Sequence, residues 1–253
     1  MVETPSTVRA DGRAARTRAA DVHVVVPLDP SGPAATLSLR GRPVAELSLR
    51  ALAGAGSVCA VTVAVTGEAS PGDPGAGGLR DVDDLLRGPL ADLERAGVAV
   101  AVHRGSRWEA ARVALATGTH RRIAIHAADR PLVGPATLDA VLAGAAGYEV
   151  AVAVLPATYT YKRVADGLVT ASPPRDRLRI LQGPWVFERD ALARAMAAVP
   201  ARSLASLDEL GLVRAAGLRV RLVAGDPLHV PVATPAAVRF AELALGGAAL
   251  GAR

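Results

Sequence analysis

Short apolar runs alternate with longer amphipathic segments throughout this chain of 253 residues. The runs are rich in Val, Ile and Ala and lie between turn residues, which is typical of buried strands. They are residues 22–27, 58–66, 98–102, 122–126, 149–155 and 218–224. Because strands that alternate with helices form βαβ units, the pattern predicts an α/β fold with a mostly parallel sheet flanked by helices.

The segments between these runs repeat apolar residues at helical spacing. The first helix is expected to begin at Pro43 and to end near Gly54, as Pro and Gly often do at helix ends. Further helices are expected around 85–93, 108–115, 136–146, 188–199 and 205–215, and from Pro235 onward. Asp81 can cap the second helix, and Pro89 is expected to interrupt it.

Two segments have no such pattern. Residues 1–20 carry arginines among Ala, Thr and Ser without an apolar period, which predicts a disordered basic tail. Residues 67–78 are rich in Gly and Pro and are expected to form a flexible loop. Because no internal repeat or strong break follows, residues 21–247 are predicted to form a single domain.

Residues 156–184 depart from the βαβ pattern. Within them, residues 159–164 and 168–170 are predicted to be short strands joined by Asp166-Gly167, which is a strong β-hairpin signal. An exposed hairpin leaves its edges unpaired. We therefore expect this segment to be an arm that packs on a second subunit in a homodimer.

Composition narrows the class of protein. Aromatic residues make up only 3% of the chain, so the core must be built from Ala, Val and Leu. No apolar run approaches the roughly 20 residues that span a bilayer, and no secretory signal follows the start, so a cytoplasmic protein without membrane association is expected. The net charge of +5 comes without a basic run, which argues against nucleic-acid binding. Cys59 is the single cysteine, which excludes an internal disulfide.

Residues 121–131 carry the clearest signal of chemistry. His126, Asp129 and Arg130 follow a short apolar run directly and precede Pro131. Ligands of open α/β sheets bind outside the carboxyl ends of the strands, so these side chains form a candidate site. A polar turn in which Asp129 accepts hydrogen bonds from backbone amides explains them equally well. The loop at residues 28–33 follows the first strand, where such folds place a phosphate-binding loop.

Several motifs, in this order, resemble those of the 2-C-methyl-D-erythritol 4-phosphate cytidylyltransferases. They are Ile125-His126-Ala127-Ala128-Asp129-Arg130-Pro131, Tyr161-Lys162-Arg163-Val164 and Gly225-Asp226-Pro227-Leu228-His229. Residues 41–52 are similar to the first helix of that family. The resemblance covers roughly residues 22–245.

The resemblance implies a Rossmann-like nucleotidyltransferase fold and a homodimer that exchanges the 156–184 arm. The family joins CMP from CTP to a polyol phosphate of the isoprenoid precursor pathway and releases pyrophosphate. By resemblance, the candidate residues are Asp129 and Arg163 for catalysis, Gly32, Gly105, Ser106, Arg107 and Asp129 for CTP or another nucleotide, and Thr160 and Arg163 for the acceptor. Mg²⁺ is the implied cofactor, with Asp129, Asp226 and His229 as candidate ligands.

The sequence departs from the family motifs where the chemistry requires charge. The family's first loop is glycine-rich and contains an arginine and then a Pro-Lys pair, whereas here Pro33 is followed by Ala34. The family places aspartate directly after the histidine, whereas here Ala127 occupies that position. Lys162 is the only lysine in the chain, so no other segment supplies the family's two lysines.

Two hypotheses follow from this pattern. The first is an enzyme of this family with weakened or lost standard activity, or with an altered nucleotide or acceptor, because losing one preorganised charge typically costs about a hundredfold in rate. The second is a pseudoenzyme that acts as a dimerising or regulatory partner. Pyrophosphate release from a nucleoside triphosphate tests the first hypothesis, and micromolar binding of CTP with Mg²⁺ would argue against the second.

Overall fold

The fold is described from a computed structural model, which covers residues 21–66 and 82–250. The tail predicted at residues 1–20, the loop predicted at 67–78 and the predicted cap Asp81 lie outside the described residues. Within the described ranges, no helix is long and apolar enough to cross a membrane.

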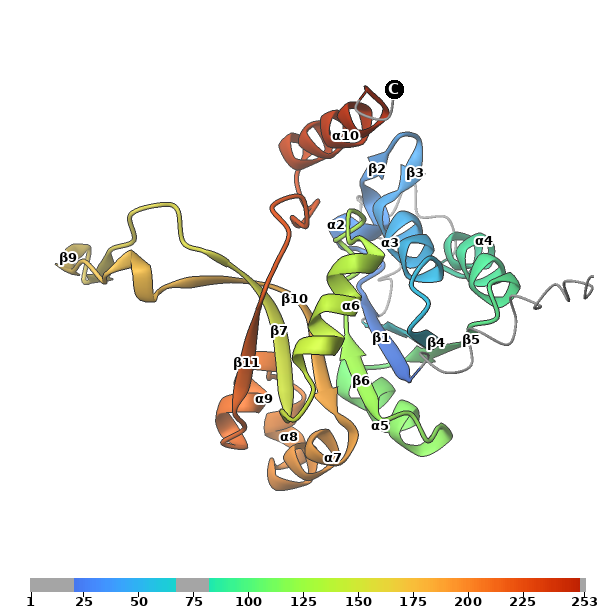
Figure 1. The fold of residues 1–253 in the computed structure, drawn as a ribbon, viewed down its shortest axis with the longest axis horizontal. Coiled ribbons are helices and arrows are strands. Elements are labelled where there is room, and N and C mark those ends of the chain that lie inside the picture. Colours follow the sequence, from blue (N-terminus) through green and yellow to red (C-terminus); the bar gives the residue numbers. More distant parts are fainter. Residues whose placement is uncertain (1–20, 67–81, 251–253) are drawn as a thin grey trace, which may run out of the picture.

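A seven-stranded sheet forms the centre of the molecule (Figure 1). From edge to edge the strands are β11 (Val220–Ala224), β7 (Val150–Pro156), β10 (Arg179–Glu188), β6 (Arg122–Ile125), β1 (Val22–Leu28), β4 (Val58–Val65) and β5 (Ala99–Arg104). Neighbouring strands are parallel except for β10, which runs antiparallel to both β6 and β7. The predicted mostly parallel sheet is confirmed, and all six predicted strands are present.

Helices cover both faces of the sheet. One face is packed by α2 (Pro33–Thr36), α3 (Val44–Ala53), α4 (Val82–Arg95) and α6 (Pro135–Gly144), and the other by α5 (Arg107–Thr117), α7 (Arg189–Ala198), α8 (Ala201–Leu204) and α9 (Glu209–Ala215). The side chains of Val24 and Val26 join the core on the first face and Val25 joins the core on the second. This division follows from the alternation of side chains along a strand, and it explains why β1 is apolar at nearly every position.

Strand β10 was not predicted from the sequence. Its register with β7 shifts between Leu181 and Trp185, across the Gly183-Pro184 pair, and the strand begins among exposed charges. Because of these features, the apolar run that follows is not recognised as a strand from the sequence. The strand matters for function because it is inserted between β6 and β7 and brings Leu181 to Trp185 beside the end of β6.

The expected interruption of the second helix at Pro89 was wrong. Helix α4 runs from Val82 through Pro89 to Arg95. A proline inside a helix removes one backbone hydrogen bond. Pro89 is itself buried, together with Leu85, Leu86 and Leu93 of the same helix, so apolar packing offsets that loss.

The predicted hairpin is present and projects away from the sheet (Figure 1), but its first strand is shorter than the predicted 159–164 and begins only at Arg163. It consists of β8 (Arg163–Ala165) and β9 (Leu168–Ala171), followed by the 3₁₀ turn η1 (Arg175–Arg177). Asp166 and Gly167 have φ values of 51° and 76°, as the predicted tight turn requires. Leu168 is 71% exposed. The role of this arm in a dimer stays a prediction, as does the single domain over residues 21–247.

A small satellite core lies beside the main sheet. It joins the two-stranded ribbon of β2 (Ser38–Leu39) and β3 (Arg42–Pro43) to the last helix, α10 (Pro235–Leu250). Leu39, Val44, Val232 and Ala241 are its buried members. Residue Val232 also donates its backbone N–H to the Asp129 carbonyl at 2.7 Å, so this core is tied to the candidate site.

Candidate functional site

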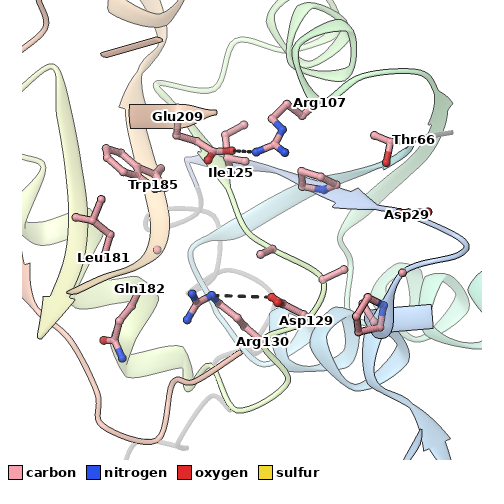
Figure 2. A pocket seen from close by; sticks show the side chains of 17 residues that line it. Asp29, Thr66, Arg107, Ile125, Asp129, Arg130, Leu181, Gln182, Trp185 and Glu209 are labelled. Atoms are coloured by element: carbon pink, nitrogen blue, oxygen red, sulfur yellow. Dashed lines mark hydrogen bonds and ion pairs between the residues drawn. The ribbon is translucent and has the colours of Figure 1, made fainter. Parts of the chain in front are cut away.

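A pocket of about 360 Å³ lies at the carboxyl ends of β1 and β6 (Figure 2). This is the edge at which an open α/β sheet binds its ligands. Its polar wall includes Asp29, Arg107, Asp129, Arg130, Gln182 and Glu209. The sequence placed Asp29, Arg107, Asp129 and Arg130 in candidate segments, and the structure brings these four to one cavity.

The loop after β1 forms one side of the pocket. Asp29 closes a tight turn there, since its Oδ1 accepts a hydrogen bond from Ser31 N at 2.9 Å and its carbonyl accepts one from Gly32 N at 3.0 Å. A Cβ atom on Gly32 would lie 3.2 Å from Asp29 Cβ and 3.3 Å from Asp29 O, closer than ordinary packing allows. A side chain at position 32 would therefore crowd Asp29, and the glycine leaves the backbone open where it lines the pocket.

The backbone around Asp129 is held in place, while one of its carboxylate oxygens has no hydrogen-bond partner among the described residues. The carbonyl of Ala128 accepts a hydrogen bond from Ser48 Oγ at 2.6 Å, and the carbonyl of Asp129 accepts one from Val232 N. Asp129 Oδ1 is buried and makes no hydrogen bond to the described residues, and it lies 4.0 Å from Arg130 Nε. Burial raises the pKa of this carboxyl group, and the charge of Arg130 partly opposes the rise.

Two arginines line the pocket, and they differ in exposure and in interaction partners. Arg130 donates from Nη1 to the His229 carbonyl at 3.0 Å, and only 16% of its side chain is exposed. Arg107 is 36% exposed at its side chain and forms an ion pair with Glu209, with 2.7 Å between Nη1 and Oε1. Glu209 was not predicted as a site residue. Its only sequence signal is an acid that follows Asp208 at a helix start, and that pattern is common in helices of every function.

His126 lies behind the pocket and does not line it. Its ring is 1% exposed and stacks on that of His229, which is fully buried, with 5.7 Å between ring centroids and 23° between ring planes. Burial is the main cause that lowers the pKa of His126 to about 3 and that of His229 to about 4. Both rings are therefore neutral at pH 7.

The predicted ligand set of Asp129, Asp226 and His229 is not assembled. Asp226 Oδ1 accepts a hydrogen bond from Leu228 N at 2.8 Å within its own turn, and His229 is buried against His126. Among the residues that the structure describes, no three His, Cys, Asp or Glu side chains are grouped so that they could hold a metal ion. Of the three, Asp129 alone lines the pocket.

The predicted nucleotide-binding residues 105–107 divide into two roles. Ser106 caps α5 in a capping box, in which Glu109 N donates to Ser106 Oγ at 3.2 Å and Ser106 N donates to Glu109 Oε2 at 2.7 Å. Gly105 has a φ of 152° and starts the turn before this cap. Arg107 lines the pocket, whereas Gly105 and Ser106 do not.

The predicted acceptor-binding residues lie on the projecting arm. Thr160 and Arg163 are exposed and do not line the pocket of their own chain. Lys162 is also exposed, and its Nζ donates to Ser172 Oγ at 2.5 Å on the arm. No lysine therefore lines this pocket.

Gln182 is a second residue that sequence reasoning missed. Its Nε2 donates to the carbonyls of Asp226 and His229 at 2.8 and 3.0 Å, and its Oε1 accepts from Asp226 N at 3.1 Å. A Cβ atom on Gly225 would lie 1.9 Å from Gln182 Oε1, so this contact requires glycine. The glycine of the Gly225-Asp226-Pro227 motif thus connects the 225–229 turn to β10 beside the pocket.

Comparison with known proteins places this geometry in one family. The family model for 2-C-methyl-D-erythritol 4-phosphate cytidylyltransferase matches residues 28–247. A cytidylyltransferase of that name from Nocardia farcinica is 34% identical over 224 residues, which cover 87% of this chain and 89% of that protein. The crystal structure of the enzyme from Thermus thermophilus is 25% identical and has a TM-score of 0.64, covering 88% of this chain and 98% of that chain.

Other relatives match over a shorter segment. The cytidylyltransferase from Symbiobacterium thermophilum is 38% identical over 126 residues, which is 49% of this chain. The matched part spans about half the length of that relative and of the one from Frankia casuarinae, at 53% and 46%.

Proposed function

This chain belongs to the 2-C-methyl-D-erythritol 4-phosphate cytidylyltransferase family, and from this premise we propose that it catalyses nucleotidyl transfer in the pocket beside Asp129. The proposed nucleotide is CTP and the proposed acceptor is 2-C-methyl-D-erythritol 4-phosphate, an intermediate of isoprenoid synthesis. The observation that carries the proposal is the carboxylate of Asp129, which lines the pocket with a buried oxygen that has no hydrogen-bond partner among the described residues and only a 4.0 Å ion pair with Arg130.

The proposed reaction is a displacement at phosphorus. An oxygen of the acceptor phosphate attacks the α-phosphorus of CTP and forms a new P–O bond. The bond between the α-phosphorus and the oxygen that bridges to the β-phosphate breaks, and pyrophosphate leaves. Because the protein contributes little covalent chemistry to such a step, its task is to position the reactants and to neutralise charge.

The described residues support this task at named places. The Gly32 backbone lines the pocket without a side chain and lets phosphates approach the 29–32 turn. Arg107 and Arg130 supply positive charge to the wall of the pocket. Ser48 and Val232 hold the backbone of residues 128–129, so the backbone that carries the Asp129 side chain is in place before substrate arrives.

Asp129 fits a role as the carboxylate that holds Mg²⁺. A buried carboxylate oxygen without a hydrogen bond is costly, and the Arg130 guanidinium group, 4.0 Å away, compensates Asp129 Oδ1 only in part. Mg²⁺ in nucleotide sites is commonly bound by one or two carboxylates plus the phosphates. When bound, the ion would neutralise charge on the triphosphate. Asp226 and His229 are not part of this proposal, because one caps its own turn and the other is buried behind it.

The acceptor side of the proposed site comes from a second subunit. Thr160 and Arg163 project from the body on the exposed arm, and Leu168 and Val169 of the same arm are 71% and 63% exposed. We propose that the arm packs on the partner of a homodimer and brings Arg163 to the acceptor phosphate in the partner's pocket. A guanidinium group suits that role because it binds phosphate in a bidentate manner.

The absence of the two lysines of the family motifs leads us to propose a slow reaction. The only lysine of the chain, Lys162, lies on the arm and bonds to Ser172 there. Loss of one preorganised cation from a transition-state site typically lowers the rate by about a hundredfold or more. We therefore propose that turnover lies well below that of relatives that retain both lysines.

Pyrophosphate release tests the proposed function. The purified protein is incubated with Mg²⁺, each nucleoside triphosphate and a panel of polyol phosphates, and reactions without acceptor serve as the control. We expect release with CTP and 2-C-methyl-D-erythritol 4-phosphate, and much less with the other nucleotides. No release above the control for any pair would contradict nucleotidyl transfer and favour an inactive homologue.

A further inference from the structure

Arg107 and Glu209 form an ion pair across the wall of the pocket, with 2.7 Å between Nη1 and Oε1 (Figure 2). We propose that this pair is a latch that an anionic nucleotide must open, and that Glu209 is a positioning residue that weakens nucleotide binding by competing for Arg107. The inference rests on the proposed nucleotide site and adds to it a residue that controls affinity.

Both partners occupy the first position of a helix. Arg107 begins α5 after the cap Ser106, and Glu209 begins α9 after the cap Asp208. The buried indole of Trp108 donates from Nε1 to the Leu207 carbonyl at 2.9 Å, which fixes one helix start against the other. The separation of the two charged groups is therefore set by the fold, and the latch needs only side-chain rotation to open.

The position of Arg107 is electrostatically unfavourable without a partner. The start of a helix carries partial positive charge, so a cation there is destabilised. Glu209 compensates this charge in the structure. An incoming phosphate offers the same compensation, so Glu209 and the nucleotide are alternative partners for one guanidinium group.

The charges of the pocket make this competition important. Three carboxylates, Asp29, Asp129 and Glu209, line it together with two guanidinium groups, so the described charged residues give a formal charge of −1. Arg130 is committed to the His229 carbonyl and is 16% exposed, whereas Arg107 is 36% exposed. Arg107 is thus the described pocket cation best placed to meet a ligand, and Glu209 neutralises it.

Replacing Glu209 with glutamine removes the charge and keeps the size of the side chain. A partly buried ion pair is worth somewhat more than an exposed one, and this pair must be broken before Arg107 can bind phosphate. We therefore expect Glu209→Gln to bind nucleotide about three- to tenfold more tightly. The gain should be larger for CTP without Mg²⁺ than with it, because the free nucleotide carries more negative charge.

Titration calorimetry with CTP, with and without Mg²⁺, and with inorganic tripolyphosphate tests the latch in five proteins and one further variant. The five are the wild type, Glu209→Gln, Arg107→Gln, the double variant, and Glu149→Gln as a matched control. Glu149 pairs with Arg194 at 3.3 Å and does not line the pocket. Urea unfolding verifies that each variant is folded, and Glu209→Ala, which has a high helix propensity, provides a second removal of the same charge.

The latch predicts tighter binding by Glu209→Gln and no gain when Arg107 is also replaced. Wild-type affinity is expected for Glu149→Gln. An equal gain in the Arg107→Gln background would overturn the latch, since Glu209 would then act by direct repulsion alone. Unchanged or weaker binding by Glu209→Gln, or no binding by any of the proteins, would also overturn it.

Failure of the proposed function has a different signature. If the wild type binds tripolyphosphate but releases no pyrophosphate from any nucleotide, the proposed nucleotidyl transfer is contradicted. The binding affinities of the variants then decide whether the latch exists. If the wild type releases pyrophosphate and Glu209→Gln binds nucleotide with the same affinity as the wild type, only the latch is contradicted.

Discussion

The buried histidines show how single residues connect this site to the stability of the fold. His126 and His229 stack behind the pocket, and His23 lies elsewhere in the core with its Nε2 2.8 Å from Thr62 Oγ1. Burial lowers the pKa of all three from 6.5, to about 3 for His126 and about 4 for the other two. The fold therefore favours their neutral forms, and the unfolded chain binds more protons than the folded chain below pH 6.5.

This difference predicts acid sensitivity with a definite sign. The stabilisation is complete above pH 6.5 and is lost as the pH falls from 6.5 toward 4, by at most about 1.4 kcal/mol per pH unit for each histidine. Urea unfolding between pH 7.5 and 5 should show a falling free energy of unfolding, and His126→Gln should reduce the slope. A free energy that does not change over this range would contradict the buried neutral histidines.

Asp29 and Asp129 illustrate how much of the candidate site could be predicted from local sequence. The turn near Asp29 and the cluster at 126–130 were placed correctly at strand ends, because strand periodicity and turn chemistry are local signals. Glu209 and Gln182 could not be found in this way. They reach the pocket from segments far along the chain, through the packing of α9 on α5 and the insertion of β10.

At the scale of elements, the turn at 225–229 is coupled to β10 through one glutamine. Gln182 makes three hydrogen bonds to this turn, and Gly225 leaves room for it. Gly225→Ala should displace Gln182 and leave buried polar groups unpaired, at a cost of about 2 kcal/mol in the free energy of unfolding. Gly56→Ala is the matched control, because a Cβ there meets nothing within 4 Å.

Urea unfolding of the two variants measures this coupling directly. We expect Gly225→Ala to be destabilised and Gly56→Ala to remain within about 0.5 kcal/mol of the wild type or slightly above it. Equal stability of Gly225→Ala and the wild type would mean that the turn and β10 are not coupled through Gln182.

The elements themselves were largely predictable, with informative exceptions. The six parallel-type strands and the Asp166-Gly167 hairpin follow from apolar runs and turn residues. Helix α4 continues through Pro89 because that ring is buried among leucines, a tertiary effect that proline's local preference does not reveal. Strand β10 could not be predicted because its register shifts at Gly183-Pro184. Only its pairing with β6 and β7 defines it as one strand, and this pairing is again a tertiary effect.

At the scale of the whole molecule, the exposed arm predicts a homodimer. Leu168 and Val169 are large apolar residues on a projecting hairpin, and such exposure is rare unless a partner covers it. Leu168→Asp combined with Val169→Asp should convert the dimer to a monomer in sedimentation experiments. Leu243→Asp on α10, a position 76% exposed, is the matched control and should leave the dimer intact.

The variant with Leu168→Asp and Val169→Asp also tests whether activity depends on the dimer. If Arg163 acts in the partner's pocket, the monomeric variant should lose acceptor turnover while it retains nucleotide binding. A wild type that sediments as a monomer and still transfers CMP would rule out the exchanged arm. The sequence alone could indicate the arm but not its destination, because a hairpin motif carries no information about the surface that covers it.

The central claim, that nucleotidyl transfer occurs beside Asp129, is tested most directly by replacing this carboxylate. Asp129→Asn keeps the shape of the side chain and removes the charge, and Asp190→Asn on the first turn of α7 is the matched control because it does not line the pocket. With CTP, Mg²⁺ and 2-C-methyl-D-erythritol 4-phosphate, we predict that pyrophosphate release falls by about a hundredfold or more in Asp129→Asn and is unchanged in Asp190→Asn. Equal rates for Asp129→Asn and the wild type would contradict the account.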